Sequence, residues 1–256
     1  MLKQLKAAFP NIEFQAQYPL AKKTYFKLGG PAEVYVELDN REELIAVINF
    51  CQDHNLKFTI FGGGSNVVVA DEGISGLVIN FKYQALIDLN KQTTTGQSLI
   101  RAGAGLSTAL LVRKSVSWGY TGLEPFLGVP GTVGGAIYNN AHYLENLISQ
   151  FIHRVEIIAE SGQVTWLSAA DCQFDYDYSR FQKTQEIILS AEFALHPGNK
   201  QDSEELIKKT TNYRIQTQPL GQPSSGCIFQ NIPNNNQLRK MFPQFADRDY
   251  LPAGFL

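Results

Sequence analysis

The stretch FTIFGGGSN, residues 58–66, joins four apolar or β-branched residues to three consecutive glycines and two polar residues. The first four residues predict a short buried strand. Because glycine lacks a Cβ, the backbone N–H groups after the strand can turn toward an anion, and Ser65 and Asn66 can add side-chain hydrogen bonds. The stretch therefore predicts either a tight turn between two buried strands or a phosphate-binding loop at Gly62, Gly63 and Gly64.

This glycine loop differs from two common nucleotide-binding motifs. Val67 occupies the place of the third glycine in a GxGxxG fingerprint, and no GxxxxGK[ST] motif occurs anywhere in the chain. The sequence therefore excludes a Rossmann fingerprint and a P-loop.

Patterned segments flank the loop on both sides. Residues 32–38 alternate apolar and polar side chains, which predicts a half-buried strand. Asn40 predicts the N-cap of a helix, with Glu43 completing a capping box and apolar residues following at helical spacing. The apolar run at residues 67–70 predicts a further strand directly after the glycine loop.

Short strands dominate the remaining sequence, which places the chain in the α+β class. Ser107 and Ser203 each predict the N-cap of a helix, residues 197–202 predict a linker, and residues 122–140 show no convincing period. The predicted strands lie at residues 76–80, 85–89, 98–102, 153–160, 164–167 and 187–195, of which 153–160 and 164–167 form a hairpin.

Composition limits the classes of function. The chain has 22 basic and 24 acidic residues, a formal net charge of -2, which argues against a general attraction to nucleic acid. No apolar run approaches the about 18 residues of a membrane span, and none follows the basic N-terminal residues as in a secretory signal. The cysteines Cys51, Cys172 and Cys227 form no CxxC pair, and no histidine has a second ligand at metal spacing. We expect a cytoplasmic protein with no membrane segment and no metal site.

A second glycine-rich segment, GVPGTVGGA at residues 128–136, leads to Asn140 and His142. So many glycines in an apolar setting predict backbone packed closely against a flat or charged group, with a structural bend as the alternative. A flavin ring and its phosphates fit this composition. Thr132 could offer a hydroxyl near the ring, and His142 could also contact such a cofactor.

Four segments in this order resemble the family of UDP-N-acetylenolpyruvoylglucosamine reductases: KTYFKLGGPA at 23–32, GGGSN at 62–66, GLEP at 122–125 and GVPGTVGGA at 128–136. The resemblance implies reduction of an enolpyruvyl ether of UDP-N-acetylglucosamine to UDP-N-acetylmuramate for peptidoglycan. NADPH would be the hydride donor and FAD the non-covalent cofactor. The FAD contacts implied are Gly62, Gly63, Gly64, Ser65, Asn66, Pro130, Gly131, Thr132, Gly134, Gly135, Asn140 and Ile188.

The same resemblance implies a domain organisation. We expect an N-terminal segment at residues 1–19, then an FAD-binding domain of the vanillyl-alcohol oxidase (PCMH) type at 20–196, with subdomains at about 20–74 and 75–196. Residues 197–256 would form a partial α+β substrate domain. The family segment normally continues for roughly fifty residues and carries a catalytic glutamate, so we expect either a truncated chain or a reduced relative. We expect a monomer.

The resemblance also implies catalytic residues, with two departures from the family pattern. Cys227 stands where a serine proton donor is commoner, and a thiol with a pKa of about 8.5 is largely protonated near neutral pH. Asp177 replaces the arginine of the family pattern, although a carboxylate cannot stabilise a developing anion. Arg180 is the candidate replacement, with a surface role as the alternative.

Residues near the C-terminus complete the predicted site. The resemblance places Tyr213 and Arg214 near the diphosphate of the substrate, with a solvated helix face as the alternative, and Asn231 against the substrate. The altered positions leave a second hypothesis open, a non-catalytic relative that binds flavin or a UDP-sugar. A third hypothesis is a flavin oxidase of the same fold.

Overall fold

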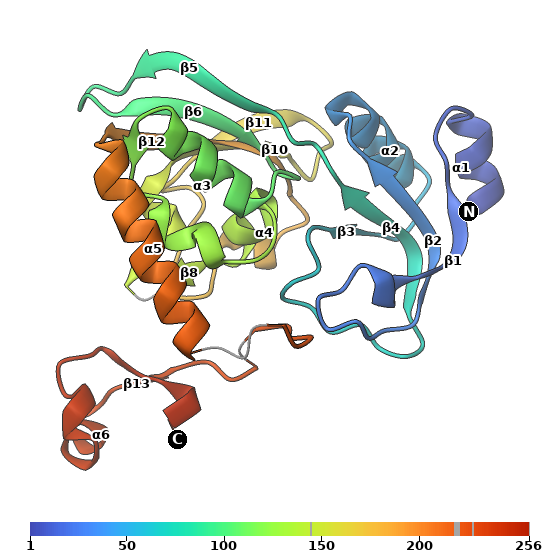
Figure 1. Cartoon of the computed structure of the whole chain (residues 1–256). Helices are drawn as coiled ribbons and strands as arrows, with labels where there is room; N and C mark the ends of the chain where they lie inside the picture. The colour runs from blue at the N-terminus through green and yellow to red at the C-terminus, as the bar shows by residue number, and fades with distance from the viewer. Residues whose placement is uncertain (144, 218–220, 227, 256) are drawn as a thin grey trace.

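The computed structural model describes residues 1–143, 145–217, 221–226 and 228–255, so the predicted proton donor Cys227 lies outside the described residues. One sheet forms from the first part of the chain and a second sheet from the middle (Figure 1). After α5, residues 221–223 lie beside residues 22–27 of the first unit, and the residues from 232 onward lie beside the second unit (Figure 1).

The first sheet has the strand order β1-β2-β4-β3. Strand β1 pairs antiparallel with β2, whereas β2 and β3 both pair parallel with β4. The sheet continues to Phe81, beyond residue 74 at which we expected the first subdomain to end. The bounds are β1 (Gln15–Pro19), β2 (Pro31–Leu38), β3 (Phe58–Phe61) and β4 (Ile74–Phe81).

Helix α2 (Arg41–Asp53) begins where the sequence predicts. The side chain of Asn40 accepts hydrogen bonds from the backbone N–H groups of Glu42 at 2.8 Å and Glu43 at 3.1 Å. These bonds satisfy two donors that the first turn of a helix leaves without an intrahelical partner. The apolar face of α2 is buried through Leu44, Val47, Ile48 and Cys51. The N-terminal helix α1 (Leu2–Ala8) and the 3-10 helix η1 (Leu20–Lys22) precede these elements.

The second sheet has β12 at its centre, in the order β11-β10-β12-β6-β5, with β7 pairing the end of β12. Strand β12 is antiparallel to both of its neighbours, β10 and β6. The predicted hairpin at residues 153–167 is confirmed as β10 and β11. The bounds are β5 (Leu86–Gln92), β6 (Ser98–Gly103), β7 (Tyr120–Thr121), β10 (Ile152–Ile158), β11 (Val164–Ser168) and β12 (Ile187–Pro197).

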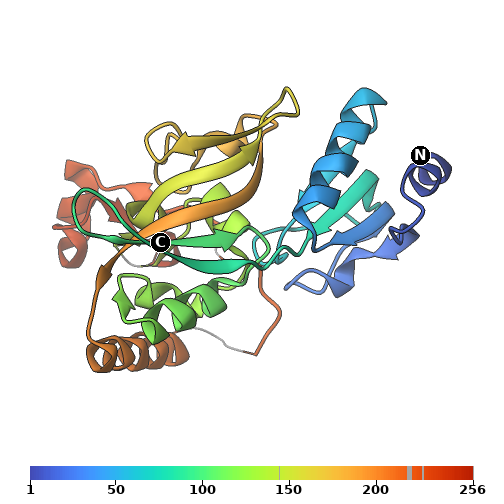
Figure 2. The same cartoon turned by 90° about the horizontal axis from the view of Figure 1, so that it is seen from above.

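Helices cover one face of the second sheet, as Figure 2 shows from above. Ser107 caps α3 (Thr108–Ser117) as predicted, because its hydroxyl accepts from the N–H of Leu110 at 3.2 Å. The 3-10 helix η2 (Glu124–Gly128) and α4 (Val133–Tyr138) follow, and α5 (Lys200–Thr217) packs against α3 and η2. Buried side chains of α2, the first sheet and the second sheet belong to one continuous core.

Short elements connect and follow these layers. Between α4 and β12 lie β8 (His142–Tyr143), β9 (Asn146–Leu147), η3 (Ile148–Phe151) and η4 (Arg180–Gln182). The C-terminal segment contains β13 (Ile232–Pro233), α6 (Asn236–Met241), η5 (Pro243–Phe245), β14 (Tyr250–Leu251) and η6 (Ala253–Phe255).

Two local predictions were wrong. Residues 67–70 form no strand, because the neighbour of β2 and β3 is β4 and the carbonyl of Ala70 instead accepts from Gly30 and Gly73. Helix α5 begins at Lys200 rather than after Ser203, whose buried hydroxyl donates to Glu124 at 2.5 Å. The segment 122–140, which shows no period, contains α4 with two glycines among its six residues.

Candidate functional site

The two glycine-rich loops predicted to form a cofactor site meet in the structure. The first follows β3, and the second precedes α4. A Cβ added at Gly63 would lie 2.8 Å from the Cα of Gly131, and one added at Gly62 would lie 2.8 Å from Oγ1 of Thr132. The hydroxyl of Ser65 donates to the carbonyl of Pro130 at 3.0 Å. Only glycine backbone allows so close an approach between the two units.

Buried polar groups hold the first loop in place. The side-chain amide of Asn80, on β4, donates to the carbonyls of Phe61 at 2.9 Å and Gly62 at 2.8 Å. The N–H of Tyr25 donates to the carbonyl of Gly64 at 2.9 Å. Gly64 has φ +66, a left-handed conformation that glycine adopts without steric cost. The carbonyls of Gly62 and Gly64 therefore bind groups of the protein itself.

The backbone N–H groups of this loop, unlike two of its carbonyls, are not bound by the described part of the protein. Among the residues that the structure describes, no hydrogen bond uses the backbone N–H groups of residues 63–66. The first turn of α4 is already satisfied, because Val133 donates to Leu106 at 2.8 Å and Gly134 donates to Ala104 at 2.8 Å. The donors available to a bound anion therefore lie in the GGGSN loop rather than at the start of α4.

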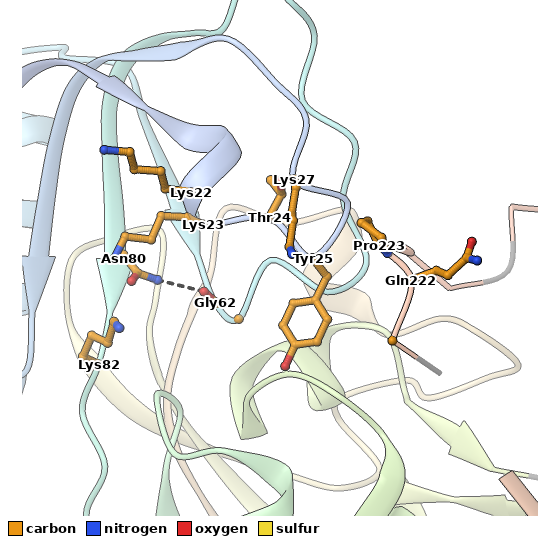
Figure 3. Close-up of a pocket in the computed structure, with 12 residues that line it drawn as sticks. Lys22, Lys23, Thr24, Tyr25, Lys27, Gly62, Asn80, Lys82, Gln222 and Pro223 are labelled. Atoms are coloured by element: carbon orange, nitrogen blue, oxygen red, sulfur yellow. Dashed lines mark hydrogen bonds between the residues drawn. The ribbon is translucent and has the colours of Figure 1, made fainter. Parts of the chain in front are cut away.

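A cavity of about 500 Å³ opens beside this loop and is lined by Gly62, Gly63 and Asn80 together with lysines (Figure 3). Figure 3 shows Lys22, Lys23 and Lys82 on the side of the cavity where Asn80 lies, and Tyr25 and Lys27 on the opposite side. The cavity places several positive charges next to unused N–H donors, which suits the phosphates of a dinucleotide. The lysines are a feature that the sequence analysis missed, although three of them lie in or next to the segment at residues 23–32.

One carboxylate offsets part of this charge. Glu37 forms an ion pair with Lys23, accepts a hydrogen bond from the hydroxyl of Tyr35 at 2.7 Å, and lies 4.0 Å from Nζ of Lys82. Burial alone would raise the pKa of Glu37, but the hydrogen bonds from Lys23 and Tyr35 outweigh it and lower the pKa. Lys22 and Lys27 have no ionic partner among the described residues. The cavity therefore keeps an excess of positive charge.

Two predicted cofactor contacts lie within the protein scaffold. Asn140 is fully buried, its amide donates to the carbonyl of Asp175 at 2.8 Å, and its Oδ1 accepts from the N–H of Ser149 at 3.2 Å. Ile188 lies on β12 opposite Ile157 and is buried. The hydrogen-bond and strand partners of both residues are other parts of the protein, and their contact with a cofactor stays a prediction.

The predicted catalytic residues of the segment 175–181 already have partners. Nδ1 of His142 and Oδ1 of Asp177 lie 2.9 Å apart. The guanidinium of Arg180 forms an ion pair with Glu186 at 2.9 Å and donates to the carbonyl of Asp171 at 3.1 Å. Arg180 is therefore held by Glu186, and its role as the replacement for an arginine at position 177 stays a prediction.

The predicted substrate residues lie on two elements. Arg214, in the last turn of α5, lies against the second glycine segment: a Cβ added at Gly128 would be 2.5 Å from its Cδ. Its guanidinium carbon lies 5.4 Å from the ring centroid of Tyr143. Tyr213, on the same helix, is half exposed, and Oδ1 of Asn231 accepts from the N–H of Ala253 at 3.0 Å. The structure thus brings Arg214, but not Asn231, against the glycine segment.

Two features are absent from the residues that the structure describes. No group of three or more histidine, cysteine, aspartate or glutamate side chains there could hold a metal ion. No helix there combines the length and the apolar character needed to cross a bilayer.

Comparison with known proteins identifies similar chains. Residues 32–168 match the family model described as an FAD binding domain. The UDP-N-acetylenolpyruvoylglucosamine reductase of Carboxydothermus hydrogenoformans is 36% identical over 213 residues, which cover 83% of this chain and 69% of that protein. The protein of the same name from Chlamydia felis is 37% identical over 216 residues, covering 84% of this chain and 70% of that protein.

Solved structures give a consistent picture. The crystal structure of UDP-N-acetylenolpyruvylglucosamine reductase from Thermus caldophilus has a TM-score of 0.72 and 26% identity, covering 91% of this chain and 80% of that one. A solvent-stable cholesterol oxidase has a TM-score of 0.55 at 15% identity, covering 73% of this chain and 38% of that one. The second likeness concerns the fold alone.

Proposed function

Because this chain belongs to the family of UDP-N-acetylenolpyruvoylglucosamine reductases, we propose that it uses NADPH to reduce the enolpyruvyl ether of UDP-N-acetylglucosamine to the lactyl ether. The product would be UDP-N-acetylmuramate, a precursor of peptidoglycan. The predicted α+β FAD-binding fold and the predicted enzyme class, an FAD-dependent oxidoreductase, are confirmed by the family match and by the relatives. FAD supplies the hydride chemistry that side chains lack.

The observation that carries the proposal is the junction of the two glycine loops. The N–H groups of residues 63–66 are unused among the described residues, and the adjoining cavity of about 500 Å³ is lined by lysines. A pyrophosphate needs this combination of close backbone approach, several donors and positive charge. In the proposal, Gly62 to Asn66 bind the pyrophosphate without a covalent bond, and residues 130–135 line the flavin.

The substrate side is assigned to residues around α5 and the C-terminal segment. Arg214 lies against Gly128, so its guanidinium can pair with a phosphate placed next to the second glycine loop. Tyr213 and Asn231 are proposed to contact the same substrate. Cys227 is proposed to deliver the proton to C2 of the enolpyruvyl group after hydride arrives at C3, because a thiol is protonated near neutral pH yet releases its proton more readily than an alcohol.

The experiment has two stages. Purified full-length protein should show the visible absorption of a flavin and release FAD on denaturation. It should then oxidise NADPH only when the enolpyruvyl sugar nucleotide is present. Cys227→Ala should abolish turnover while the flavin spectrum stays unchanged, and Cys227→Ser should retain turnover. A protein that carries no flavin and gains none on reconstitution would refute the proposal.

A second candidate is a relative that binds flavin and the UDP-sugar without turnover. The observation that favours it is the pairing of Asp177 with His142 and of Arg180 with Glu186, because neither pair leaves a free guanidinium in that segment. Calorimetry that shows substrate affinity in a chain of verified mass, together with no NADPH oxidation, would select this candidate.

We further propose that the chain acts in the cytoplasm as a monomer that does not bind nucleic acid. The proposed substrates, a UDP-sugar and NADPH, are cytoplasmic small molecules, and the formal net charge of -2 gives no general attraction to polyanions. Light scattering of the FAD-bound protein tests the oligomeric state, and a mass of two chains would refute this part of the proposal.

A further inference from the structure

The reaction proposed above needs a positive group near the substrate carboxylate, and this inference rests on that proposed function. Hydride addition to C3 of an enolpyruvyl group moves negative charge onto C2 and its carboxylate. Arg180, the cation that the sequence offers in the segment 175–181, is bound to Glu186. A different cation therefore has to be sought among the described residues.

His142 is placed to supply this charge. Its Nδ1 lies 2.9 Å from Oδ1 of Asp177, and both side chains are a little under one third exposed. With Nδ1 engaged, Nε2 of His142 has no hydrogen-bond partner among the described residues. The ring of Tyr176 lies at a tilt against the imidazole, with centroids 5.1 Å apart. The ring is thus held on two sides and has one nitrogen available to a ligand.

The loop that carries Asp177 is fastened to the end of α4. The hydroxyl of Ser179 and the amide of Gln182 both donate to the carbonyl of Tyr138, at 2.6 Å and 3.1 Å. Asn140 donates to the carbonyl of Asp175 at 2.8 Å. Asp177 and Asn140 both have left-handed φ values, +51 and +44, which persist only where surrounding contacts hold them. The pair is therefore preorganised relative to α4.

The position of the pair links the cofactor site to the C-terminal segment. Helix α4 begins at the second glycine loop and has six residues, a rise of about 9 Å, so His142 lies just beyond its far end. Tyr176, next to Asp177, stacks on Tyr250 of β14 with centroids 4.6 Å apart. A substrate held between the flavin and the segment that carries Asn231 would therefore pass this pair.

We propose that His142, as the imidazolium, binds the carboxylate of the enolpyruvyl group through Nε2–H, and that Asp177 is a positioning residue that holds Nδ1–H. The imidazolium has a proton on each nitrogen, so it can donate to Asp177 and to the substrate at the same time. The neutral ring donates only once, and its Nδ1–H is bound to Asp177. The assignment explains how a chain with a carboxylate at position 177 still presents a positive group to an anionic substrate.

Binding measurements on FAD-loaded protein test this assignment. The ligands are UDP-N-acetylglucosamine enolpyruvate and UDP-N-acetylglucosamine, which differ by the carboxylate-bearing group. Calorimetry should show that wild type prefers the first, and His142→Gln should reduce that preference about tenfold, the loss expected for one hydrogen bond to a charged group. Asp177→Asn, which tolerates the left-handed backbone, should reduce it less. His153→Gln, an exposed histidine on β10, is the matched control and should not change it.

The pH dependence separates a binding role from a structural one. The preference of wild type for the carboxylate ligand should fall as pH rises from about 5.5 to about 8.5, because the neutral imidazole no longer donates from Nε2 to the substrate. In His142→Gln the preference should be constant over this range. The other titratable or charged groups that face His142 are Asp177, Tyr176 and Tyr143, with Tyr250 beyond Tyr176 and Arg214 beyond Tyr143.

Two results would overturn the inference, and they are distinguishable. An unchanged preference and an unchanged pH trend in His142→Gln, with a normal flavin spectrum, would overturn the inference alone. Absence of both FAD and UDP-sugar binding in wild type would overturn the proposed function and this inference with it.

Discussion

At the residue scale, Gly63 has no room for a side chain. A Cβ there would lie 2.8 Å from the Cα of Gly131, a backbone atom that can yield only if one loop moves. Gly63→Ala should therefore raise the dissociation constant of FAD at least tenfold and cost about 1–3 kcal/mol of stability, as overpacking typically does. Titration of the apoprotein with FAD, followed by flavin fluorescence, measures the first effect.

Gly96→Ala is the control for this substitution. Gly96 has a left-handed φ, +83, and a Cβ there would meet no atom within 4 Å. In this control, backbone strain should lower the free energy of unfolding by about 1–2 kcal/mol, while the affinity for FAD stays that of wild type. If Gly63→Ala binds FAD as tightly as Gly96→Ala, the loop junction is not the cofactor site.

Two cysteines should be chemically inert in the folded protein. Burial raises the pKa of Cys51 to about 11 and that of Cys172 to about 12, so both remain neutral thiols at pH 8. The thiolate is the reactive form, and both side chains are fully buried. Iodoacetamide at pH 8, followed by mass spectrometry, should leave both unmodified until denaturant is added. Rapid labelling of either one in native protein would contradict the packing described for α2 or for the segment before η4.

The sequence predicted the part of the site that is built from glycine backbone. Three adjacent glycines at residues 62–64 and the cluster at 128–135 point to close backbone approach, and the loops do meet. The pairing of His142 with Asp177 could not be predicted, because the two residues are far apart in sequence and only the folded loop brings them within 2.9 Å. The lysines of the cavity are likewise ordinary surface residues until the fold gathers them.

At the element scale, predictions succeeded where period and capping agree. The helix after Asn40 has both signals, and the hairpin at 153–167 combines strand patterning with a turn at Ser161-Gly162. Helix α4 was not predicted, because Gly134 and Gly135 have low helix propensity. It is held by its cap, the Thr132 hydroxyl that accepts from the N–H of Gly135 at 3.4 Å, and by tertiary bonds to Leu106 and Ala104. The apolar run at 67–70 resembles a strand, but pairing partners, not apolarity, decide which run enters a sheet. The sequence of residues 67–70 does not show whether a neighbouring strand is available to pair with them.

The centre of the second sheet carries a charged network whose effect depends on pH. Glu192 on β12 is almost fully buried and accepts hydrogen bonds from Arg101 on β6 at 2.7 Å and from Arg154 on β10 at 2.7 Å. Both guanidinium groups also lie over the ring of Trp166. Burial alone would raise the pKa of Glu192, but the hydrogen bonds from Arg154 and Arg101 outweigh it and lower the pKa.

The sign of this shift predicts an acid-sensitive contribution to stability. A carboxyl group whose pKa is lower in the folded state stabilises the fold fully above its unfolded pKa of about 4.3, and this contribution is lost as pH falls through the folded pKa. Glu192→Gln should lower the free energy of unfolding at pH 7 by about 1–3 kcal/mol, and the deficit should shrink in acid. Urea unfolding at pH 7 and at successively lower pH measures it. Glu205→Gln, on the exposed face of α5, should show no deficit, and an equal deficit in both variants would contradict the argument.

At the scale of the whole molecule, an ion pair between described residues joins the two units that contribute the glycine loops. Arg41, the first residue of α2, donates to Glu156 of β10 at 2.6 Å, and Glu156 also accepts from Ser190 at 2.8 Å. Removing the guanidinium leaves a mostly buried carboxylate with one partner, which costs about 2–4 kcal/mol. Arg41→Ala should therefore lower the melting temperature and weaken FAD binding, because the loops depend on how the units are positioned.

The matched control is Arg113→Ala, an exposed arginine on α3 with no ion pair among the described residues. It should leave both the melting temperature and the FAD affinity unchanged. If Arg41→Ala lowers the melting temperature but binds FAD as tightly as the control, the pair stabilises the fold without positioning the loops.

The central place of β12 in its sheet has a consequence for synthesis of the protein on the ribosome. Its partners β6 and β10 both precede it in the chain, and β12 ends at Pro197. Until Pro197 leaves the exit tunnel, β12 is missing from between the β10–β11 hairpin and the β5–β6 hairpin. Both hairpins then expose unpaired edges and apolar faces to other nascent chains. Premature release or a slow codon cluster before this point should favour aggregation, whereas the same delay placed after it should be harmless.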